Sequence, residues 1–246
     1  MASMAFSRRG LVALGLALLL AACSRSAPDA PVGSLPPPPP ADSHTVLVTA
    51  FEPFGGHATN ASWEVVKRLE GQTIADHRVV TLRLPVVYDA VEAPLRASVD
   101  AHRPRVVVAF GLGRDRIHVE RFARNGYHPK RPPDEAGRPP PRDVLVPGGA
   151  EAVQTTLPVA AILARLAAQK IGAEPSDDAG GYLCNECFYR LMALRGGAAD
   201  AIRIRGFVHL PDLDAPDPAG GTYTLERLEA AVRAIVEESI AAARGP

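Results

Sequence analysis

The run Thr45-Val-Leu-Val-Thr49 sets the fold class of this chain. It is a short, continuous series of apolar and β-branched residues, as expected of a strand buried on both faces of a parallel sheet. Comparable runs recur at 79–84, 106–110 and 202–209, and segments with helical spacing fall at 62–69, 88–102, 158–171, 184–194 and 224–243. This alternation predicts an α/β fold, a three-layer α/β/α sandwich around a mostly parallel, twisted sheet, as a single domain over residues 44–246.

The composition excludes several classes of protein. The chain has 246 residues, of which 47% are apolar and 22% charged, so it is neither disordered nor fibrous. Lys+Arg and Asp+Glu balance at 27 each, and no basic patch stands out in the sequence. We therefore expect no nucleic-acid partner.

The N-terminal segment predicts export. Arg8 and Arg9 precede an apolar run at 11–22, which is shorter than the roughly 20 residues that a permanent membrane-spanning helix needs. Leu20-Ala-Ala-Cys23 resembles a lipobox, in which the cysteine thiol is acylated and becomes the first mature residue. The prediction is a lipoprotein signal peptide at 1–22 and lipidation of Cys23. A plain signal peptide with an incidental cysteine is the alternative.

Residues 23–43 predict a tether behind the lipid. The segment is rich in Pro, Ala and Ser and contains five consecutive prolines at 36–40, so it favours an extended spacer. Cleavage of the signal segment would remove two arginines and leave the mature protein with a slight excess of acidic side chains. The lipid, and not charge, would therefore hold it at the membrane. Ser24 is compatible with sorting to the outer membrane. We expect a lipoprotein of the cell envelope that faces the periplasm.

Motifs for nucleotides, zinc proteases and serine hydrolases are absent from the sequence. There is no G-x-x-x-x-G-K-[ST] loop, no H-E-x-x-H helix and no G-x-S-x-G elbow, and Gly111-Leu-Gly113 lacks the third glycine of a dinucleotide fingerprint. Cys184-Asn-Glu-Cys187 with His118 or His128 is a weak zinc signal, because a second C-x-x-C pair is missing. We predict no metal and no cofactor.

Three residues have the chemistry of a cysteine nucleophile and its base. Cys184 opens a predicted helix, where unpaired backbone N–H groups favour a thiolate, although a buried structural cysteine is the alternative. His209 ends a predicted strand and can take up and return the thiol proton. Glu120 is the best-placed carboxylate to orient the imidazole, unless it only pairs with Arg121 on the surface.

At these residues the chain resembles the pyroglutamyl peptidase I (pyrrolidone-carboxylate peptidase) family of cysteine peptidases, over His44 to about Leu213. Four motifs carry the resemblance in order. They are Val48-Thr-Ala-Phe-Glu-Pro-Phe-Gly-Gly56 with Asn60-Ala-Ser-Trp63, Gly113-Arg114 through Glu120-Arg121 to Asn125, Ala179-Gly180 through Cys184-Asn185 to Phe188-Tyr189, and Gly206-Phe-Val-His209-Leu-Pro211.

The resemblance implies removal of N-terminal pyroglutamyl residues from peptides, with Cys184 as nucleophile, His209 as base and Glu120 as orienting group. It implies further that Phe51 and Phe54 clamp the uncharged ring and that Asn60 supports their loop. The Cys184 N–H, with Arg131 or its neighbour Lys130, would bind the oxyanion. Two states of assembly stay open, a homo-oligomer as in family members and a tethered monomer.

Two departures from the family pattern concern the predicted ring pocket. Ala50 replaces a family glycine, and Phe110 stands where the family has a glutamine that offers its backbone carbonyl to the ring. A phenylalanine in this place is expected to narrow the pocket. The alternatives are therefore an amidohydrolase of altered specificity, or a non-catalytic binding lipoprotein with a pocket closed by Phe110.

Cys187 is a third departure, since the family has an apolar residue here. Its spacing from Cys184 is that of a redox C-x-x-C pair, so a disulfide that silences the nucleophile is a hypothesis, and a small buried hydrophobe is the alternative. A thiol-disulfide oxidoreductase is a further alternative, which leaves Glu120 and His209 unused. The proline-rich loop at 131–147 and the segment at 212–221 are either functional loops or surface excursions.

Overall fold

The computed structural model describes residues 44–113, 115–128, 130–140 and 144–245; the predicted signal peptide, Cys23 and the tether lie outside them. The strands are β1 (Thr45–Phe51), β2 (Thr73–Ile74), β3 (His77–Leu84), β4 (Val106–Leu112), β5 (Ile117–Glu120), β6 (Phe122–Arg124), β7 (Ala152–Gln154), β8 (Ala173–Ser176) and β9 (Ile204–Leu210). The helices are α1 (Ala61–Val66), α2 (Glu92–His102), α3 (Val159–Ala168), α4 (Leu183–Ala193) and α5 (Leu225–Ala243), with short 3₁₀ turns at Lys67–Leu69 and Gly197–Ala201.

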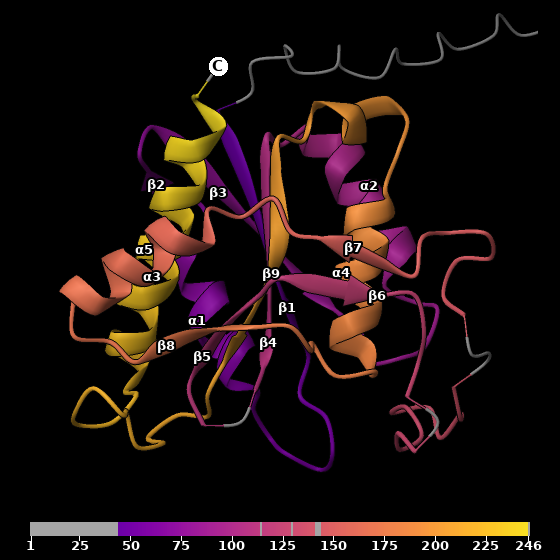
Figure 1. Cartoon of the computed structure of the whole chain (residues 1–246), viewed down its shortest axis with the longest axis horizontal. Coiled ribbons are helices and arrows are strands. Elements are labelled where there is room, and N and C mark those ends of the chain that lie inside the picture. Colours follow the sequence, from indigo (N-terminus) through magenta and orange to yellow (C-terminus); the bar gives the residue numbers. More distant parts are fainter. Residues whose placement is uncertain (1–43, 114, 129, 141–143, 246) are drawn as a thin grey trace, which may run out of the picture. The chain divides into compact units, whose positions relative to one another are not determined.

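Seven strands form the central sheet in the order β2-β3-β1-β4-β9-β5-β8 (Figure 1). The four strands β3, β1, β4 and β9 run parallel, and β5 pairs antiparallel with β9 and parallel with β8. β6 and β7 make a separate antiparallel pair beside α4. The α/β fold with a mostly parallel sheet is thus confirmed.

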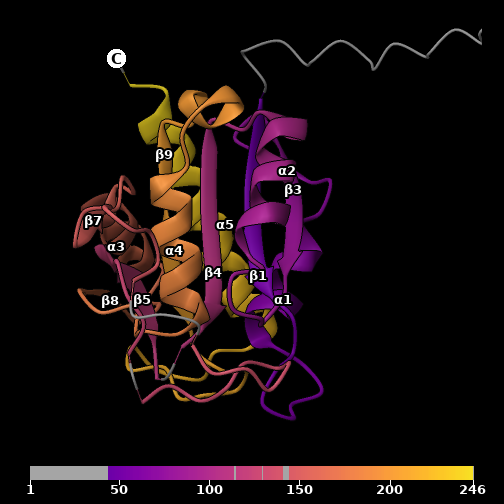
Figure 2. The ribbon, with the colours of Figure 1, turned by 90° about the vertical axis from the view of Figure 1, so that its right-hand side faces the viewer.

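Two helical layers cover the sheet; in Figure 2, α2 and α4 lie in front of the strands and α5 lies behind them. The layer of α1, α3 and α5 packs on one face, and α2 and α4 pack on the other. Each face has its own core. The first contains Val46, Val48 and Phe110, and the second contains Leu47, Phe51 and Phe207. Successive side chains of a strand point to opposite faces, which is why neighbours such as Phe110 and Ala109 fall in different cores.

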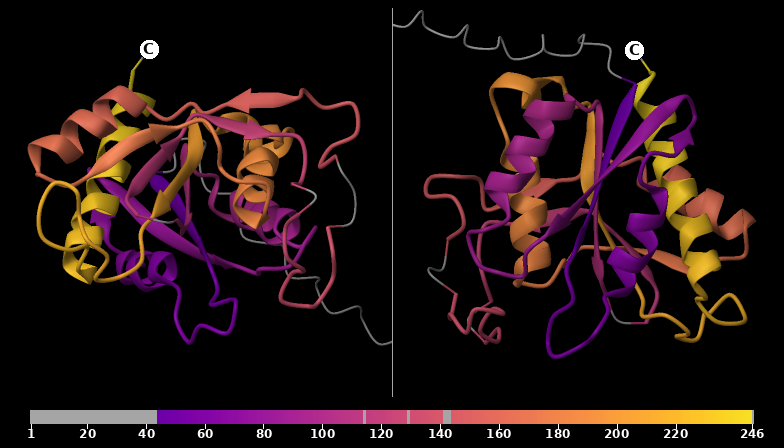
Figure 3. Two further views of the ribbon diagram at one scale, coloured as in Figure 1. Left: turned by 60° about the horizontal axis from the view of Figure 1, so that its bottom comes forward. Right: turned by 180° about the vertical axis from the view of Figure 1, so that it is seen from behind.

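Both ends of the domain lie at the amino ends of the strands (Figure 3). β1 begins directly after His44, whose ring contacts that of His77 at the start of β3. At the other terminus, Arg203 precedes β9 and donates to the carbonyl oxygens of Ala243 and Gly245. The carboxyl ends of β1, β4 and β9, where α/β proteins bind ligands, lie at the opposite edge of the sheet.

Local backbone conformation accounts for the differences from the predicted elements. The helix predicted from Tyr88 begins only at Glu92, because Asp89 adopts a left-handed conformation, with φ of 60°. The helix predicted to reach Ile171 ends at Ala168, just before the left-handed Lys170. The short strands β2, β5, β6, β7 and β8 were not expected. The structure describes no membrane-spanning helix in the ranges above.

Candidate active site

The two glycines of Gly111-Leu-Gly113 create the room for the site at the end of β4. A Cβ on Gly111 would lie 2.9 Å from Cys184 Sγ and 2.7 Å from the Phe207 ring. A Cβ on Gly113 would lie 2.8 Å from the Cβ of His209. Only a glycine fits at either position without displacing the proposed nucleophile or base. In the sequence, the pair is an incomplete nucleotide motif and Gly113 opens the glutamate motif, but neither pattern predicts this close packing.

Cys184 is the second residue of α4 and is partly exposed. The first turn of a helix has backbone N–H groups without intrahelical partners, and the side chain of the N-cap residue Tyr182 does not cap them. The Tyr182 hydroxyl instead donates to the carbonyl of Pro133, at 3.1 Å. The N–H groups around Cys184 are therefore suited to bind an oxyanion.

His209 lies between a carboxylate and the Cys184 sulfur. Its Nδ1 is 2.7 Å from Glu120 Oε1, and Glu120 is buried, with 1% of its side chain exposed. Burial disfavours the charged imidazole, but the Cys184 thiolate and the Glu120 carboxylate outweigh burial and raise the pKa of His209 to about 10. The ring of Phe207 packs against the imidazole, with 4.9 Å between the centroids. The arrangement favours a protonated imidazole beside the Cys184 sulfur.

The strand pairing brings these groups together. β5 and β9 are antiparallel, and His118 lies opposite His209, so both point to one face with Glu120, two residues further along β5. His118 does not approach the cysteines; its Nε2 lies 3.1 Å from Glu174 Oε1. No three His, Cys, Asp or Glu side chains of the described chain are grouped as a metal site.

Asn185 fastens the first turn of α4 to the end of β6. Its Oδ1 accepts from the Arg124 N–H, and its Nδ2 donates to the carbonyls of Arg124 and Gly126, at 2.9 to 3.0 Å. Asn185 is 2% exposed. Asn185 stands in the cysteine motif of the sequence, but its bonding partners lie about 60 residues away and were not predicted.

Glu186 fastens the same turn on its other side. Its Oε1 accepts from the Asp89 N–H at 2.9 Å and from Arg190 Nε at 3.1 Å. Arg190 also bonds the carboxylates of Asp89 and Glu92, at 2.6 and 2.7 Å. Burial raises the pKa of Glu186, although Tyr127 and Arg190 act against it. The sequence did not predict this network, since its members are far apart in the chain.

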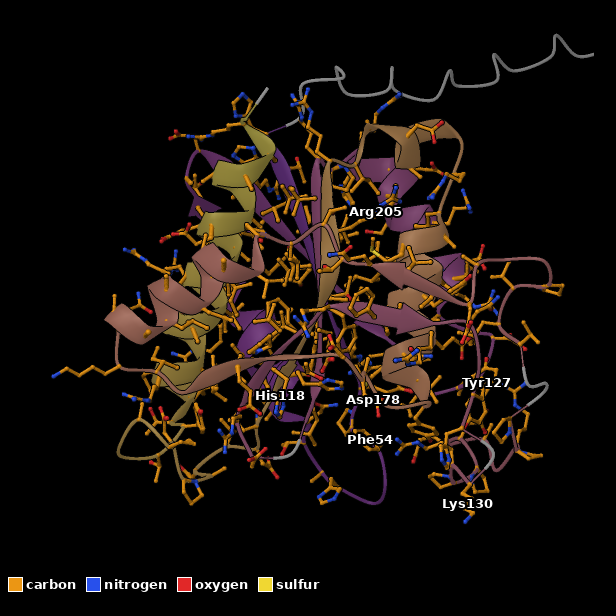
Figure 4. The ribbon with its side chains drawn as sticks, viewed as in Figure 1. Phe54, His118, Tyr127, Lys130, Asp178 and Arg205 are labelled. Carbon is orange, nitrogen blue, oxygen red and sulfur yellow. The ribbon has the colours of Figure 1, made fainter. Side chains whose placement is uncertain are left out.

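The loop at 131–138 lies against the residues that precede α4 and its N-cap, so it is not a plain surface excursion. Tyr88 donates from its hydroxyl to the Pro132 carbonyl, and Asp134 accepts from the Tyr88 N–H. A Cβ on Gly180, four residues before Cys184, would lie 2.9 Å from Arg131 Nη2. In the described part of the chain, Arg131 Nε is buried without a hydrogen-bond partner. Its neighbour Lys130 is exposed at the rim of the molecule, which favours Arg131 as the arginine of the site (Figure 4).

Phe51, the last residue of β1, and Phe54, in the loop that follows, are buried to different extents. Phe51 is 2% exposed at the end of β1, and Phe54 is partly buried against the same core, at the carboxyl edge of the sheet (Figure 4). The loop is tied down by Glu135, whose Oε1 accepts from the Gly55 N–H at 2.8 Å. Glu135 was not among the predicted residues.

Asn60 supports this loop from beneath and is not placed to contact a substrate. It is 1% exposed, caps α1 by accepting from the Ser62 N–H, and donates to the Glu52 carbonyl. Its polar atoms are occupied within the scaffold, so Asn60 supports the loop and makes no contact of its own with a ligand.

The structure corrects the prediction that the Phe110 side chain narrows the ring pocket. Phe110 is 0% exposed and packs in the core beneath α1 and α5, together with Ala50. Cys184 packs against the other core, on the other face of the sheet. The two departures from the family pattern therefore present their side chains away from the nucleophile, and Gly111 is the residue of β4 that faces it.

Comparisons with known proteins agree with this geometry. The family model described as pyroglutamyl peptidase matches residues 44–242. The pyrrolidone-carboxylate peptidase of Gloeobacter violaceus is 45% identical over 170 residues, 68% of this chain and 82% of that protein. The corresponding enzyme of Chromobacterium violaceum is 40% identical over 201 residues, 80% of this chain and 92% of that protein.

Solved structures show the same fold. The crystal structure of Bacillus amyloliquefaciens pyroglutamyl peptidase I matches with a TM-score of 0.73 and 31% identity, over 80% of this chain and 97% of that one. Pyrrolidone carboxyl peptidase of Pyrococcus furiosus matches with a TM-score of 0.72 and 29% identity, over 81% and 99% of the two chains. With the family model matching most of the chain, and with Cys184, His209 and Glu120 brought together, the protein belongs to the pyroglutamyl peptidase family.

Proposed function

We propose that the protein removes N-terminal pyroglutamyl residues from peptides as a cysteine peptidase. The observation that carries the proposal is the line from Glu120 through His209 to Cys184 at the carboxyl edge of the sheet. A thiolate beside an imidazolium is ready to attack without a separate deprotonation step. Family membership supplies the class of substrate.

The reaction follows from the positions of these groups. The Cys184 thiolate attacks the pyroglutamyl carbonyl, and the N–H groups of the first turn of α4 stabilise the oxyanion, with Arg131 beside them. His209 gives its proton to the leaving amine, which departs and leaves a thioester on Cys184. The neutral His209 then takes a proton from water, which hydrolyses the thioester and restores the thiolate–imidazolium pair.

Two features support recognition of an uncharged ring. Phe54 offers a partly exposed apolar ring that packs on the core containing Phe51, and the Glu135 and Asn60 bonds hold their loop in place before a substrate arrives. Such preorganisation reduces the entropy lost on binding. The side chains of Ala50 and Phe110 lie on the other face of the sheet, which favours the pyroglutamyl peptidase over an enzyme of altered specificity.

Release of a fluorescent amine from a pyroglutamyl amide tests the proposal. The protein under reductant should turn the substrate over, and Cys184→Ala should not. If turnover is absent while Cys184 is rapidly alkylated at neutral pH, an amidohydrolase with another substrate is indicated. If the thiol is inert as well, the binding protein replaces the enzyme.

We further propose that the enzyme is a lipoprotein anchored through Cys23, facing the periplasm from the outer membrane. The lipobox at Leu20-Ala-Ala-Cys23 and the proline-rich segment behind it support this location. Cells fed a radiolabelled fatty acid should label the protein and should not label Cys23→Ser. An unlabelled wild-type protein in the soluble periplasmic fraction would contradict the anchor. The state of assembly is a separate question, and light scattering distinguishes a homo-oligomer from a monomer.

A further inference from the structure

We propose that Cys184 and Cys187 close a reversible disulfide within α4 that switches the enzyme off and protects its nucleophile from irreversible oxidation. The proposal rests on the proposed function only in that Cys184 is the nucleophile. Both cysteines are free thiols in the structure, at the second and fifth positions of α4. They therefore lie on one side of the helix, the side that faces the sheet.

The spacing is compatible with a disulfide. Residues three apart in a helix have Cβ atoms about 5–6 Å apart. A disulfide brings them to about 3.5–4.5 Å, so the two residues must approach by about 1–2 Å. Cys184 lies in the first turn, where the chain changes from the extended backbone of Tyr182 to the helix, so little regular structure is disturbed.

The two thiols differ in exposure, which suits Cys184 to react with an oxidant and Cys187 to form the disulfide with the oxidised Cys184 afterwards. Cys184 is partly exposed and lies beside the His209 imidazole, a base that can take up its proton, so its sulfur is the one that meets a dissolved oxidant first. Cys187 is 0% exposed, enclosed by the core of α2 and α4. Burial raises the pKa of the Cys187 thiol well above its usual range, so this thiol is unreactive toward solvent. Its accessible reaction partner is an oxidised Cys184.

The chemistry balances with a peroxide as oxidant. The Cys184 thiolate attacks the O–O bond of hydrogen peroxide, which leaves a sulfenic acid on Cys184 and, after protonation, one water. The Cys187 sulfur then attacks the Cys184 sulfur, and the hydroxyl group leaves with the Cys187 proton as a second water. A dithiol reductant reverses the bond, becomes a disulfide itself and restores both thiols.

The switch follows from the identity of the sulfur involved. A Cys184 sulfur bonded to Cys187 has no thiolate to attack a carbonyl, so activity falls at least about tenfold. The same bond stops the oxidation of Cys184 at a reversible stage, because only a sulfenic acid that persists goes on to the sulfinic and sulfonic acids.

The experiment uses the full chain with Cys23→Ser, so that Cys184 and Cys187 are the remaining cysteines. The matched variants are Cys187→Ala and Cys187→Val, which keep the nucleophile and differ in how they fill the core. Each protein is treated with hydrogen peroxide and then with dithiothreitol. Intact mass, alkylation after denaturation and amidase activity are measured at each stage.

We expect the parent to lose two hydrogens, to resist alkylation at both cysteines and to regain its activity with dithiothreitol. Both Cys187 variants should be active under reductant, but with excess peroxide their Cys184 should gain two oxygens, as a sulfinic acid, and they should stay inactive after dithiothreitol. A sulfinic Cys184 beside a free Cys187 in the parent overturns the proposal, as does an intermolecular dimer. A disulfide in a protein without amidase activity under reductant would instead contradict the proposed function, which keeps the two failures distinct.

Discussion

On the side of α1, α3 and α5, buried polar side chains such as Asn60, Asp217 and Ser239 bond the scaffold alone, whereas on the side of α2 and α4 the buried carboxylate of Glu120 bonds the catalytic His209. On the first face, the buried hydroxyl of Ser239 bonds the Ile235 carbonyl of its own helix. On the second, Glu120 and Glu186 each bond a group from another element. The difference teaches that one face provides stability through packing, and the other also holds catalytic groups in fixed positions.

His209→Ala should show the largest effect, because it removes the base from the second face. We expect kcat to fall about 10²–10⁴-fold, the usual contribution of general acid–base catalysis. The variant also leaves the buried Glu120 carboxylate without its partner, so we expect the free energy of unfolding to fall by about 1–3 kcal/mol while the fold persists. Amide hydrolysis and circular dichroism measure the two quantities. Retention of full activity would remove the catalytic role of this face.

Glu186→Ala should show whether the buried network contributes more to the free energy of unfolding than an exposed ion pair does. The change leaves the Asp89 N–H without its acceptor and Arg190, with 10% of its side chain exposed, without one of three carboxylates. We expect the free energy of unfolding to fall by about 2–4 kcal/mol. Urea unfolding measures it.

Glu92→Ala is the matched control for that variant, because Glu92 pairs with the same arginine but is 40% exposed. Its loss should cost less than about 1 kcal/mol. Equal losses for the two variants would mean that burial does not distinguish them and that the network is not a special feature of this face.

Glu120→Gln should change the pH dependence of the reaction. The Glu120 carboxylate helps to raise the pKa of His209 to about 10, so its removal lowers that pKa. The imidazolium is then lost at a lower pH, and the alkaline limb of kcat/KM should move to lower pH, with kcat reduced about tenfold at the optimum. A pH–rate profile of both proteins checks this, and an unmoved alkaline limb would speak against the Glu120–His209 coupling.

Phe110→Leu should show the smallest effect and should act through packing alone. Phe110 is wholly buried on the face away from Cys184, so we expect about 1 kcal/mol less stability. The ratio kcat/KM for a pyroglutamyl amide should stay within about twofold of the parent. Thermal unfolding and steady-state kinetics report the two. A large rise in KM with unchanged stability would return Phe110 to the substrate site.

The strongly periodic segments of the sequence predicted the fold, but the short strands, such as those at the sheet edges, were not predicted. The runs at 45–49, 106–110 and 202–209 became β1, β4 and β9, since apolar β-branched runs have few other solutions in a buried sheet. β8 (Ala173–Ser176) is an edge strand that contains Pro175, a residue that argues against a strand when it is read locally. Such strands form because a neighbour is present, which local sequence does not show.

The candidate site was predicted unevenly for a similar reason. Cys184, His209 and Glu120 stand in recognisable motifs, and the antiparallel pairing of β5 with β9 brings the last two together. The face on which Phe110 lies depends on its place in the alternation of β4, which the motif comparison ignored. Asn185 stands in the cysteine motif, but the groups that it bonds, like the Asp89 and Glu92 partners of Arg190, are more than 50 residues away, so no local pattern reveals these bonds.

The position of the chain termini has a practical consequence. The domain begins at His44 and ends near Gly245 at the amino ends of the strands, whereas Cys184 faces the carboxyl ends. A solid support, a purification tag or a fusion partner joined ahead of His44 therefore attaches to the domain on the side away from the nucleophile. An immobilised form of the enzyme would keep its catalytic edge open to long peptides in the surrounding solution.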